Sequence, residues 1–214
     1  MTMSARPAHL VLVIGTATEV GKTWVGGQVL TILRTAGISV AARKPAQSFD
    51  PSDTGPTDAE VLADATGETP EQVCPPHRSY QVPMAPPMAA DALGLPPPTL
   101  AQLLGELAWP EPTPAIGWVE TVGGPRSPIG VDGDAVDFAA AVQPDTVVLV
   151  ADAGLGAVNA VLVSLAPFSN FRVVVILNRY DKSLDLHRRN LNWLQTREGL
   201  EVVINPEALS KMFL

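Results

Sequence analysis

Cysteine is almost absent from this sequence: its 214 residues include one, Cys74. A single cysteine cannot form an internal disulfide, which fits a reducing compartment, and we expect a cytoplasmic protein. The first residues lead directly into an apolar run and lack the layout of a signal peptide. No apolar run reaches the about 18 residues of a spanning helix, so no membrane partner is expected.

Positive charge is also scarce. Lys and Arg total 14 against 22 Asp and Glu, and the formal net charge is −8. Nucleic-acid binding requires a basic face, so we expect no nucleic-acid partner. The three histidines and Cys74 form no metal set, and no Ser-His-Asp or Cys-His catalytic arrangement can be argued. Apolar residues make up 46 %, and the length suits one domain over residues 1–214.

Apolar runs alternate with helix-like stretches along the chain. Strands are predicted at residues 10–14, 38–43, 116–120, 146–150, 172–177 and 202–204. Helices are predicted at residues 22–35, 57–66, 100–107, 135–142, 157–165 and 185–196. Prolines interrupt residues 70–98, where little regular structure is expected except around 88–93. Continuous apolar strands separated by helices are typical of an α/β fold, with a mostly parallel sheet covered on both faces.

The segment GTATEVGKT, Gly15 to Thr23, lies between the first strand and the first helix. Phosphate-binding loops read Gly, four residues and then Gly-Lys-Ser/Thr, and here the first glycine stands one position early. Backbone N–H groups at the helix start would cradle phosphate, Lys22 would add a cation and the Thr23 hydroxyl could ligate Mg²⁺. We therefore expect a P-loop NTPase-like fold whose nucleotide contacts include Thr18, Glu19, Val20, Gly21, Lys22, Thr23 and Trp24. A glycine-rich turn with a surface lysine is the alternative.

The displaced glycine makes this loop resemble that of the dethiobiotin synthetase family. The segment ARKPAQS resembles the family's Lys-Pro-x-x-Ser/Thr stretch, which places Lys44 at the position of the catalytic lysine and Ser48 on the substrate side. Phosphoryl transfer to a carbamate gathers negative charge, which Lys22 and Lys44 together would offset. A lysine that extends from a strand end to solvent is the alternative for Lys44.

A magnesium site is implied by the same resemblance. Asp58 precedes Ala59 as in similar proteins, and Glu120 ends a predicted strand. Together with Thr23 they would supply three oxygens to Mg²⁺ on the phosphates. A helix-start acid favoured by the helix dipole is the alternative for Asp58. The family pattern after the glutamate is Gly-Ala-Gly-Gly, whereas this chain has Thr121 and Val122 before two glycines, which would narrow the site.

Further segments resemble the family's substrate and base contacts. The resemblance places Pro83 in the wall of the diamino acid site, with Thr121 beside it. It places Leu155, Gly156 and Asn159 at a helix start that reaches the partner subunit's substrate. It places Asn178, and less specifically Pro206 and Glu207, at the nucleotide base. The alternatives are a proline-rich connection, an ordinary helix start and a turn-starting Asn.

The resemblance covers most of the chain and implies an ATP-dependent ligase of biotin biosynthesis that is a homodimer. The family joins 7,8-diaminononanoate, CO₂ and ATP to give dethiobiotin, ADP and phosphate. Two other functions stay open: a non-catalytic nucleotide-binding regulatory module, and an amidating synthase of the cobyrinic acid type, although such synthases usually carry a glutaminase domain. A partitioning ATPase is disfavoured because no lysine lies between Gly15 and Val20. ATP, CTP and GTP are not distinguished.

Overall fold

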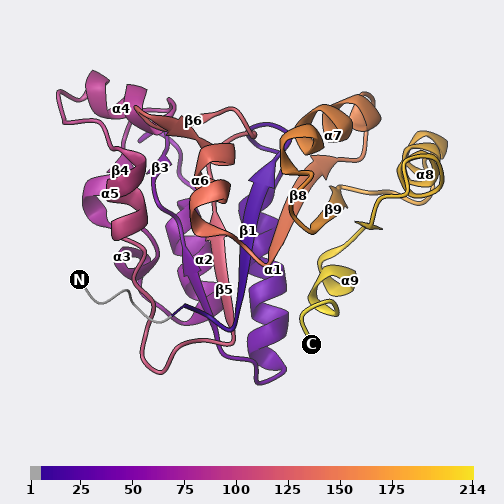
Figure 1. Cartoon of the computed structure of the whole chain (residues 1–214), viewed down its shortest axis with the longest axis horizontal. Helices are drawn as coiled ribbons and strands as arrows, with labels where there is room; N and C mark the ends of the chain where they lie inside the picture. Colours follow the sequence, from indigo (N-terminus) through magenta and orange to yellow (C-terminus); the bar gives the residue numbers. More distant parts are fainter. Residues whose placement is uncertain (1–5) are drawn as a thin grey trace.

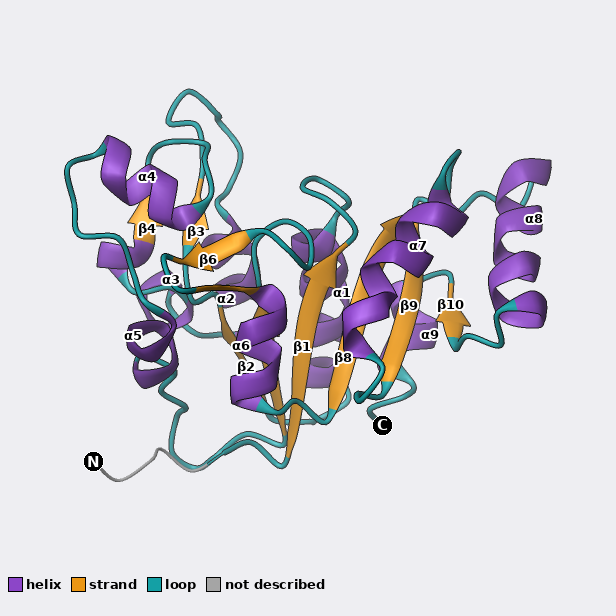
Figure 2. Ribbon diagram, turned by 45° about the horizontal axis from the view of Figure 1, so that its top comes forward, coloured by secondary structure: helices purple, strands orange, loops and turns teal. Residues whose placement is uncertain are grey.

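The computed structural model describes residues 6–214 and is built on one six-stranded parallel sheet (Figures 1 and 2). The strand order is β10-β9-β8-β1-β5-β2, so the first strand lies in the interior of the sheet. The strands are β1 (His9–Gly15), β2 (Val40–Arg43), β5 (Ile116–Glu120), β8 (Thr146–Asp152), β9 (Val173–Asn178) and β10 (Val202–Val203). The predicted α/β fold with a mostly parallel sheet is confirmed.

Helices cover both faces of the sheet (Figure 2). One face carries α1 (Lys22–Thr35), α2 (Asp58–Thr66), α3 (Pro70–Val73) and α9 (Pro206–Ser210). The other carries α4 (Pro86–Ala92), α5 (Leu100–Gly105), α6 (Ala135–Val142) and α7 (Ala157–Leu165). Helix α8 (Asp185–Asn192) lies at the edge of the sheet beyond β10 (Figure 2) and continues as a π-helical turn, Trp193–Arg197.

The strands are apolar at successive positions because each one contributes to two cores. In β1, Val11 and Val13 pack beneath α1, whereas Leu10, Leu12 and Ile14 pack beneath α6. Successive side chains of a strand point to opposite faces, so a strand covered on both sides needs no polar alternate. This pattern holds β1 rigidly and places the loop after it at the carboxyl edge.

The proline-rich stretch contains more structure than the sequence predicted. There α3, which was not predicted, begins at Pro70 behind a Thr69–Gln72 capping box. The structure expected around residues 88–93 is present as α4, which begins at Pro86. Proline suits the first turn of a helix, where the N–H has no intrahelical partner. Two-residue pairings were also missed. They join β3 (Gln47–Ser48) to β4 (Ser79–Tyr80), and β6 (Pro128–Gly130) to β7 (Gly133–Asp134).

Remaining differences are at element ends. The second strand begins at Val40, and β8 and β9 run on to Asp152 and Asn178. A short 3₁₀ turn, Pro76–Arg78, precedes β4, and another, Ala166–Phe168, follows α7. Within residues 6–214, no helix combines the length and the apolar character needed to cross a bilayer.

Candidate functional site

The sheet order brings three functional segments to one edge. The loop after β1, the residue after β2 and the last residue of β5 are neighbours because β5 lies between β1 and β2. In register, Arg43 pairs with Val119 and Val13 pairs with Glu120, so Lys44 and Glu120 emerge at the same level. Ligands of open parallel sheets bind at this carboxyl edge.

The loop between β1 and α1 is held close to the neighbouring backbone. Gly15 donates its N–H to the Gly123 carbonyl, and a Cβ at Gly15 would lie 2.6 Å from the Ala17 oxygen. Gly21 caps α1 with φ 92°, and a Cβ there would lie 2.2 Å from Asn178 Nδ2. Both glycines are therefore required by close approach, and Gly21 also by its left-handed conformation.

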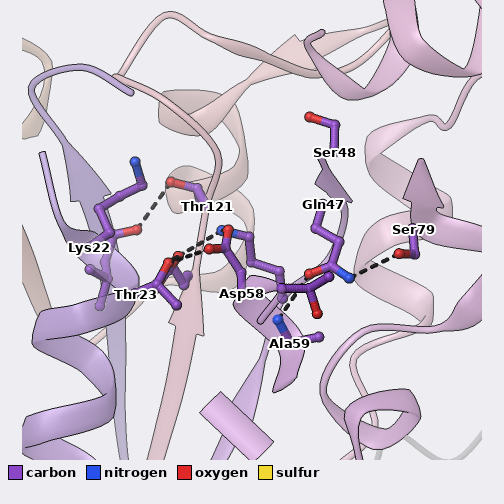
Figure 3. A network of polar contacts seen from close by, with 12 residues as sticks. Lys22, Thr23, Gln47, Ser48, Asp58, Ala59, Ser79 and Thr121 are labelled. Carbon is purple, nitrogen blue, oxygen red and sulfur yellow. Dashed lines mark hydrogen bonds and ion pairs between the residues drawn. The ribbon is translucent and has the colours of Figure 1, made fainter. Parts of the chain in front are cut away.

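Four polar side chains meet at the start of α1. Lys44 Nζ lies 2.6 Å from Asp58 Oδ2 and 2.7 Å from Glu120 Oε1. The Thr23 hydroxyl lies 2.6 Å from Asp58 Oδ1 and 2.7 Å from Glu120 Oε1, and its single proton can be donated to one of them at a time. Figure 3 shows the side chains of Thr23 and Asp58 pointing toward one another. Lys44 and Glu120 are fully buried, whereas the Asp58 side chain is 41 % exposed.

The charges of this cluster depend on each other. Burial alone would lower the pKa of Lys44, but Asp58 and Glu120 outweigh it and hold that pKa above its ordinary value. Burial would raise the pKa of Asp58, yet Lys44 and the Thr23 hydroxyl hold it below its usual range. Burial and repulsion by Lys44 lower the pKa of Lys22, which donates to the Ala17 carbonyl at 3.3 Å. An incoming anion would relieve this repulsion.

A cavity of about 1110 Å³ opens over the cluster. Of the residues predicted for the site, its lining includes Thr18, Glu19, Gly21, Lys22, Thr23, Lys44, Ser48, Asp58 and Pro83. Glu120 lies beneath it, bonded to Lys44. Val122 lines the cavity, whereas Thr121 is buried and donates its hydroxyl to the Val13 carbonyl.

The remaining predicted residues lie outside this cavity. Val20 is buried in the core beneath the loop, and Trp24 is 52 % exposed on the first turn of α1. Asn178 is buried at the end of β9 and donates from Nδ2 to the Val20 carbonyl at 2.9 Å. Pro206 and Glu207 begin α9, which packs on α1. Leu155, Gly156 and Asn159 are exposed around the start of α7.

Two contributors were missed from the sequence. Gln47 is buried and joins three elements, accepting from the Ala59 N–H at 2.9 Å and donating to Ser79 Oγ at 2.9 Å (Figure 3). It thereby fixes the start of α2 and the position of Asp58. The segment 49–57 forms one wall of the cavity and brings Asp50 and Asp53 to it. The Asp, Ser, Gly and Pro content of this segment is typical of a loop, but it does not show that the loop lines the cavity.

Sequence comparison shows the family to which this chain belongs. A family model described as "AAA domain" matches residues 9–211. A Haloferax mediterranei protein named ATP-dependent dethiobiotin synthetase BioD is 31 % identical over 207 residues, covering 92 % of this chain and 84 % of the relative. This chain belongs to the dethiobiotin synthetase family. Relatives of the same name from Anaeromyxobacter dehalogenans and Rhodococcus jostii are each 33 % identical, covering 89 % and 91 % of the chain.

Solved structures place this member of the dethiobiotin synthetase family among P-loop folds. A putative plasmid partition protein from Borrelia burgdorferi, bound to AMPPNP, superposes with a TM-score of 0.56 and 14 % identity, over 94 % of this chain and 87 % of that one. The signal recognition particle receptor FtsY from Elizabethkingia anophelis gives a TM-score of 0.54 at 14 % identity, over 98 % of this chain and 66 % of that one. At this identity the likeness concerns the fold alone.

Proposed function

We propose that this chain is an ATP-dependent dethiobiotin synthetase that converts 7,8-diaminononanoate, CO₂ and ATP into dethiobiotin, ADP and phosphate. The observation that carries the proposal is Lys44, a second buried lysine set beside the phosphate-binding loop and paired with two carboxylates. The relatives that match most of the chain carry this activity in their names.

The nucleotide phosphates would bind in the loop from Thr18 to Thr23. Backbone N–H groups at the start of α1 and the positive end of that helix favour an anion there. Lys22 is buried at the same point, and burial together with repulsion by Lys44 lowers its pKa. Asn178, Pro206 and Glu207 are proposed to lie on the base side.

Mg²⁺ would be held by Thr23, Asp58 and Glu120. These groups present only oxygen atoms, which suit this hard cation. Glu120 Oε2 is buried and has no hydrogen-bond partner among the described residues, as expected of an oxygen that binds a cation. Residues 6–214 contain no cluster of three or more His, Cys, Asp or Glu side chains suited to a metal, so phosphate oxygens and water would complete the shell. When bound, the ion would offset charge on the β- and γ-phosphates.

Lys44 would act on the transferred group. One amine of the diamino acid adds to CO₂ and loses a proton, giving a carbamate. A carbamate oxygen attacks the γ-phosphorus, the bond to ADP breaks, and a carbamic-phosphoric anhydride forms. The second amine attacks the carbonyl carbon of this anhydride and loses a proton, the carbon–oxygen bond to phosphate breaks, and the ring closes as phosphate leaves. Lys44 and Lys22, which both line the cavity, would offset the negative charge that the two reactants bring together.

The diamino acid is proposed to bind between Ser48, Pro83 and Val122, since Val122 and not Thr121 lines the cavity. Leu155, Gly156 and Asn159 do not line this cavity, and Leu155 is 93 % exposed. We propose that they meet the substrate of a second copy in a homodimer. Sedimentation of the wild type and of Leu155→Asp tests this, because a charge at a buried interface position would shift the dimer toward the monomer.

The reaction is tested by its product. Purified protein is incubated with Mg-ATP, ¹³C-bicarbonate and 7,8-diaminononanoate, and mass spectrometry is used to find dethiobiotin that carries one labelled carbon. Labelled product supports the proposal. Binding of Mg-ADP without labelled product would instead indicate a non-catalytic nucleotide module.

A further inference from the structure

Glu19 and Arg179 both have a left-handed backbone conformation, which is unusual for residues other than glycine, and they contact each other. Glu19, at the tip of the phosphate-binding loop, has φ 59°, and Arg179, just after β9, has φ 56°. Arg179 Nη2 donates to the Glu19 carbonyl at 2.8 Å. Arg179 Nη1 lies 2.9 Å from Asp152 Oδ2, at the end of β8. Backbone strain of this kind persists only where its surroundings enforce it.

The adjacent residue makes a parallel contact. Asn178 Nδ2 donates to the Val20 carbonyl at 2.9 Å. The last residue of β9 and the residue after it therefore hold two consecutive carbonyls of the loop. In a trans peptide the C=O and the following N–H point in opposite directions. Fixing the carbonyls of Glu19 and Val20 toward β9 therefore turns the N–H groups of Val20 and Gly21 away from it, into the loop.

Asp152 in turn orients Arg179. Its Oδ1 accepts the Gly154 N–H at 2.8 Å, which leaves Oδ2 facing the guanidinium. The planar guanidinium can serve both partners at once, Asp152 through one nitrogen and the Glu19 carbonyl through the other, which a lysine ammonium cannot do with the same geometry.

We propose that Arg179 is a positioning residue for the nucleotide: through the Glu19 carbonyl it sets the loop N–H groups that receive phosphate, and Asp152 sets Arg179. The inference rests on the proposed nucleotide binding at this loop. A purely structural role does not explain the contact, because the two side chains of the ion pair are 58 % and 45 % exposed and exposed pairs contribute little to stability.

Three variants separate the contact from its surroundings. Arg179→Gly keeps the left-handed backbone and removes the side chain, Arg179→Lys keeps the charge without the fork, and Asp152→Asn weakens the anchor. Arg172→Ala is the matched control, because Arg172 precedes β9 at the opposite edge and pairs with Glu201 on the surface. Each protein is titrated with Mg-ADP by calorimetry, unfolded in urea, and assayed for kcat and for KM with ATP.

Arg179→Gly is expected to weaken Mg-ADP binding and to raise the KM for ATP about tenfold, with a smaller change in kcat, since one charge-assisted contact is lost. Asp152→Asn and Arg179→Lys should fall between the wild type and Arg179→Gly, and Arg172→Ala should match the wild type. Equal Mg-ADP affinity in Arg179→Gly and the wild type would overturn the inference, as would a loss explained by lower unfolding free energy. A wild type that binds no Mg-ADP would instead refute the proposed function.

Discussion

Lys44 Nζ lies 2.7 Å from Glu120 Oε1, and both side chains are closed to solvent. Lys44 follows β2 and Glu120 ends the adjacent strand β5, so the two residues lie at the same level of the sheet. An ionised group buried without a partner costs several kcal/mol, so each depends on the other. The pair therefore keeps a cation beneath the cavity in the free protein, next to the phosphate-binding loop.

The first prediction concerns stability without ligands. Lys44→Met should lower the free energy of unfolding by about 3 kcal/mol, because it leaves the buried Glu120 carboxylate without its ion-pair partner. Glu120→Gln should lower it by less, because Asp58 still pairs with Lys44. The double variant should lose clearly less than the sum of the two. Urea unfolding measures this, with Arg172→Ala as an exposed-pair control that should lose no more than about 1 kcal/mol. Additive losses would contradict the coupling.

The second prediction concerns the metal. Lys44 lies within 2.7 Å of a carboxylate oxygen from both Asp58 and Glu120, the groups proposed to hold Mg²⁺. In the absence of nucleotide, Lys44→Met should therefore bind Mn²⁺ at least about tenfold more tightly than the wild type, since a neighbouring cation is removed. Electron paramagnetic resonance of free Mn²⁺ reports the affinity. Lys182→Met, at an exposed lysine, should change nothing; equal affinity in the Lys44 variant would count against a shared carboxylate site.

A pair of glycines isolates the geometry of the loop. Gly21 and Gly37 both have left-handed backbones, but a Cβ at Gly21 meets Asn178 whereas a Cβ at Gly37 meets nothing within 4 Å. Gly37→Ala should cost about 1 kcal/mol from backbone strain alone. Gly21→Ala should cost more and should weaken Mg-ADP binding about tenfold or more, because the loop must shift.

Calorimetry and urea unfolding of both variants measure this difference. If Gly21→Ala also carries Asn178→Ala, part of the lost stability should return because the clash is removed. Equal effects of the two glycine substitutions would contradict the steric account.

The elements that were predicted correctly have strong local signals. The first helix, β5, α6 and α7 have the predicted bounds, because their apolar spacing and flanking residues agree. Helix α2 begins after Thr57, whose capping box with Glu60 is visible in the sequence. Parallel strands end at one edge, so the neighbourhood of the loop, Lys44 and Glu120 followed from the order of the motifs along the chain.

The parts that sequence did not provide depend on tertiary contacts. The two-residue strands are too short to have a periodicity, and α4 starts at a proline that reads equally as a loop residue. The contact of Arg179 with Glu19 joins residues 160 positions apart, and its strength depends on backbone conformations that no local pattern gives. The sequence also does not show which of two neighbours reaches the cavity. In the structure Thr121 donates to the Val13 carbonyl, and Val122 lines the cavity.

Acid should weaken the ion pair between Arg78 and Glu106. Hydrogen bonds from Arg78 hold the pKa of Glu106 below its usual range. A carboxyl with a lowered folded-state pKa stabilises fully above its unfolded pKa, about 4.3, and loses this as pH falls through the folded value. The wild type should exceed Glu106→Gln by about 1–2 kcal/mol from pH 6 to 8, and by progressively less below about pH 4. Urea unfolding across this range measures it, and a difference that grows toward acid would have the wrong sign.

The most direct test of the central claim is phosphate release from Mg-ATP and bicarbonate, with and without 7,8-diaminononanoate, in the wild type and in Lys44→Met. The account predicts that release by the wild type depends on the diamino acid. It also predicts that Lys44→Met retains Mg-ADP binding but loses about 100-fold or more in kcat, because a charge aimed at the transferred group is gone. Phosphate release that does not depend on the diamino acid, or that is unchanged in Lys44→Met, would contradict the proposed function.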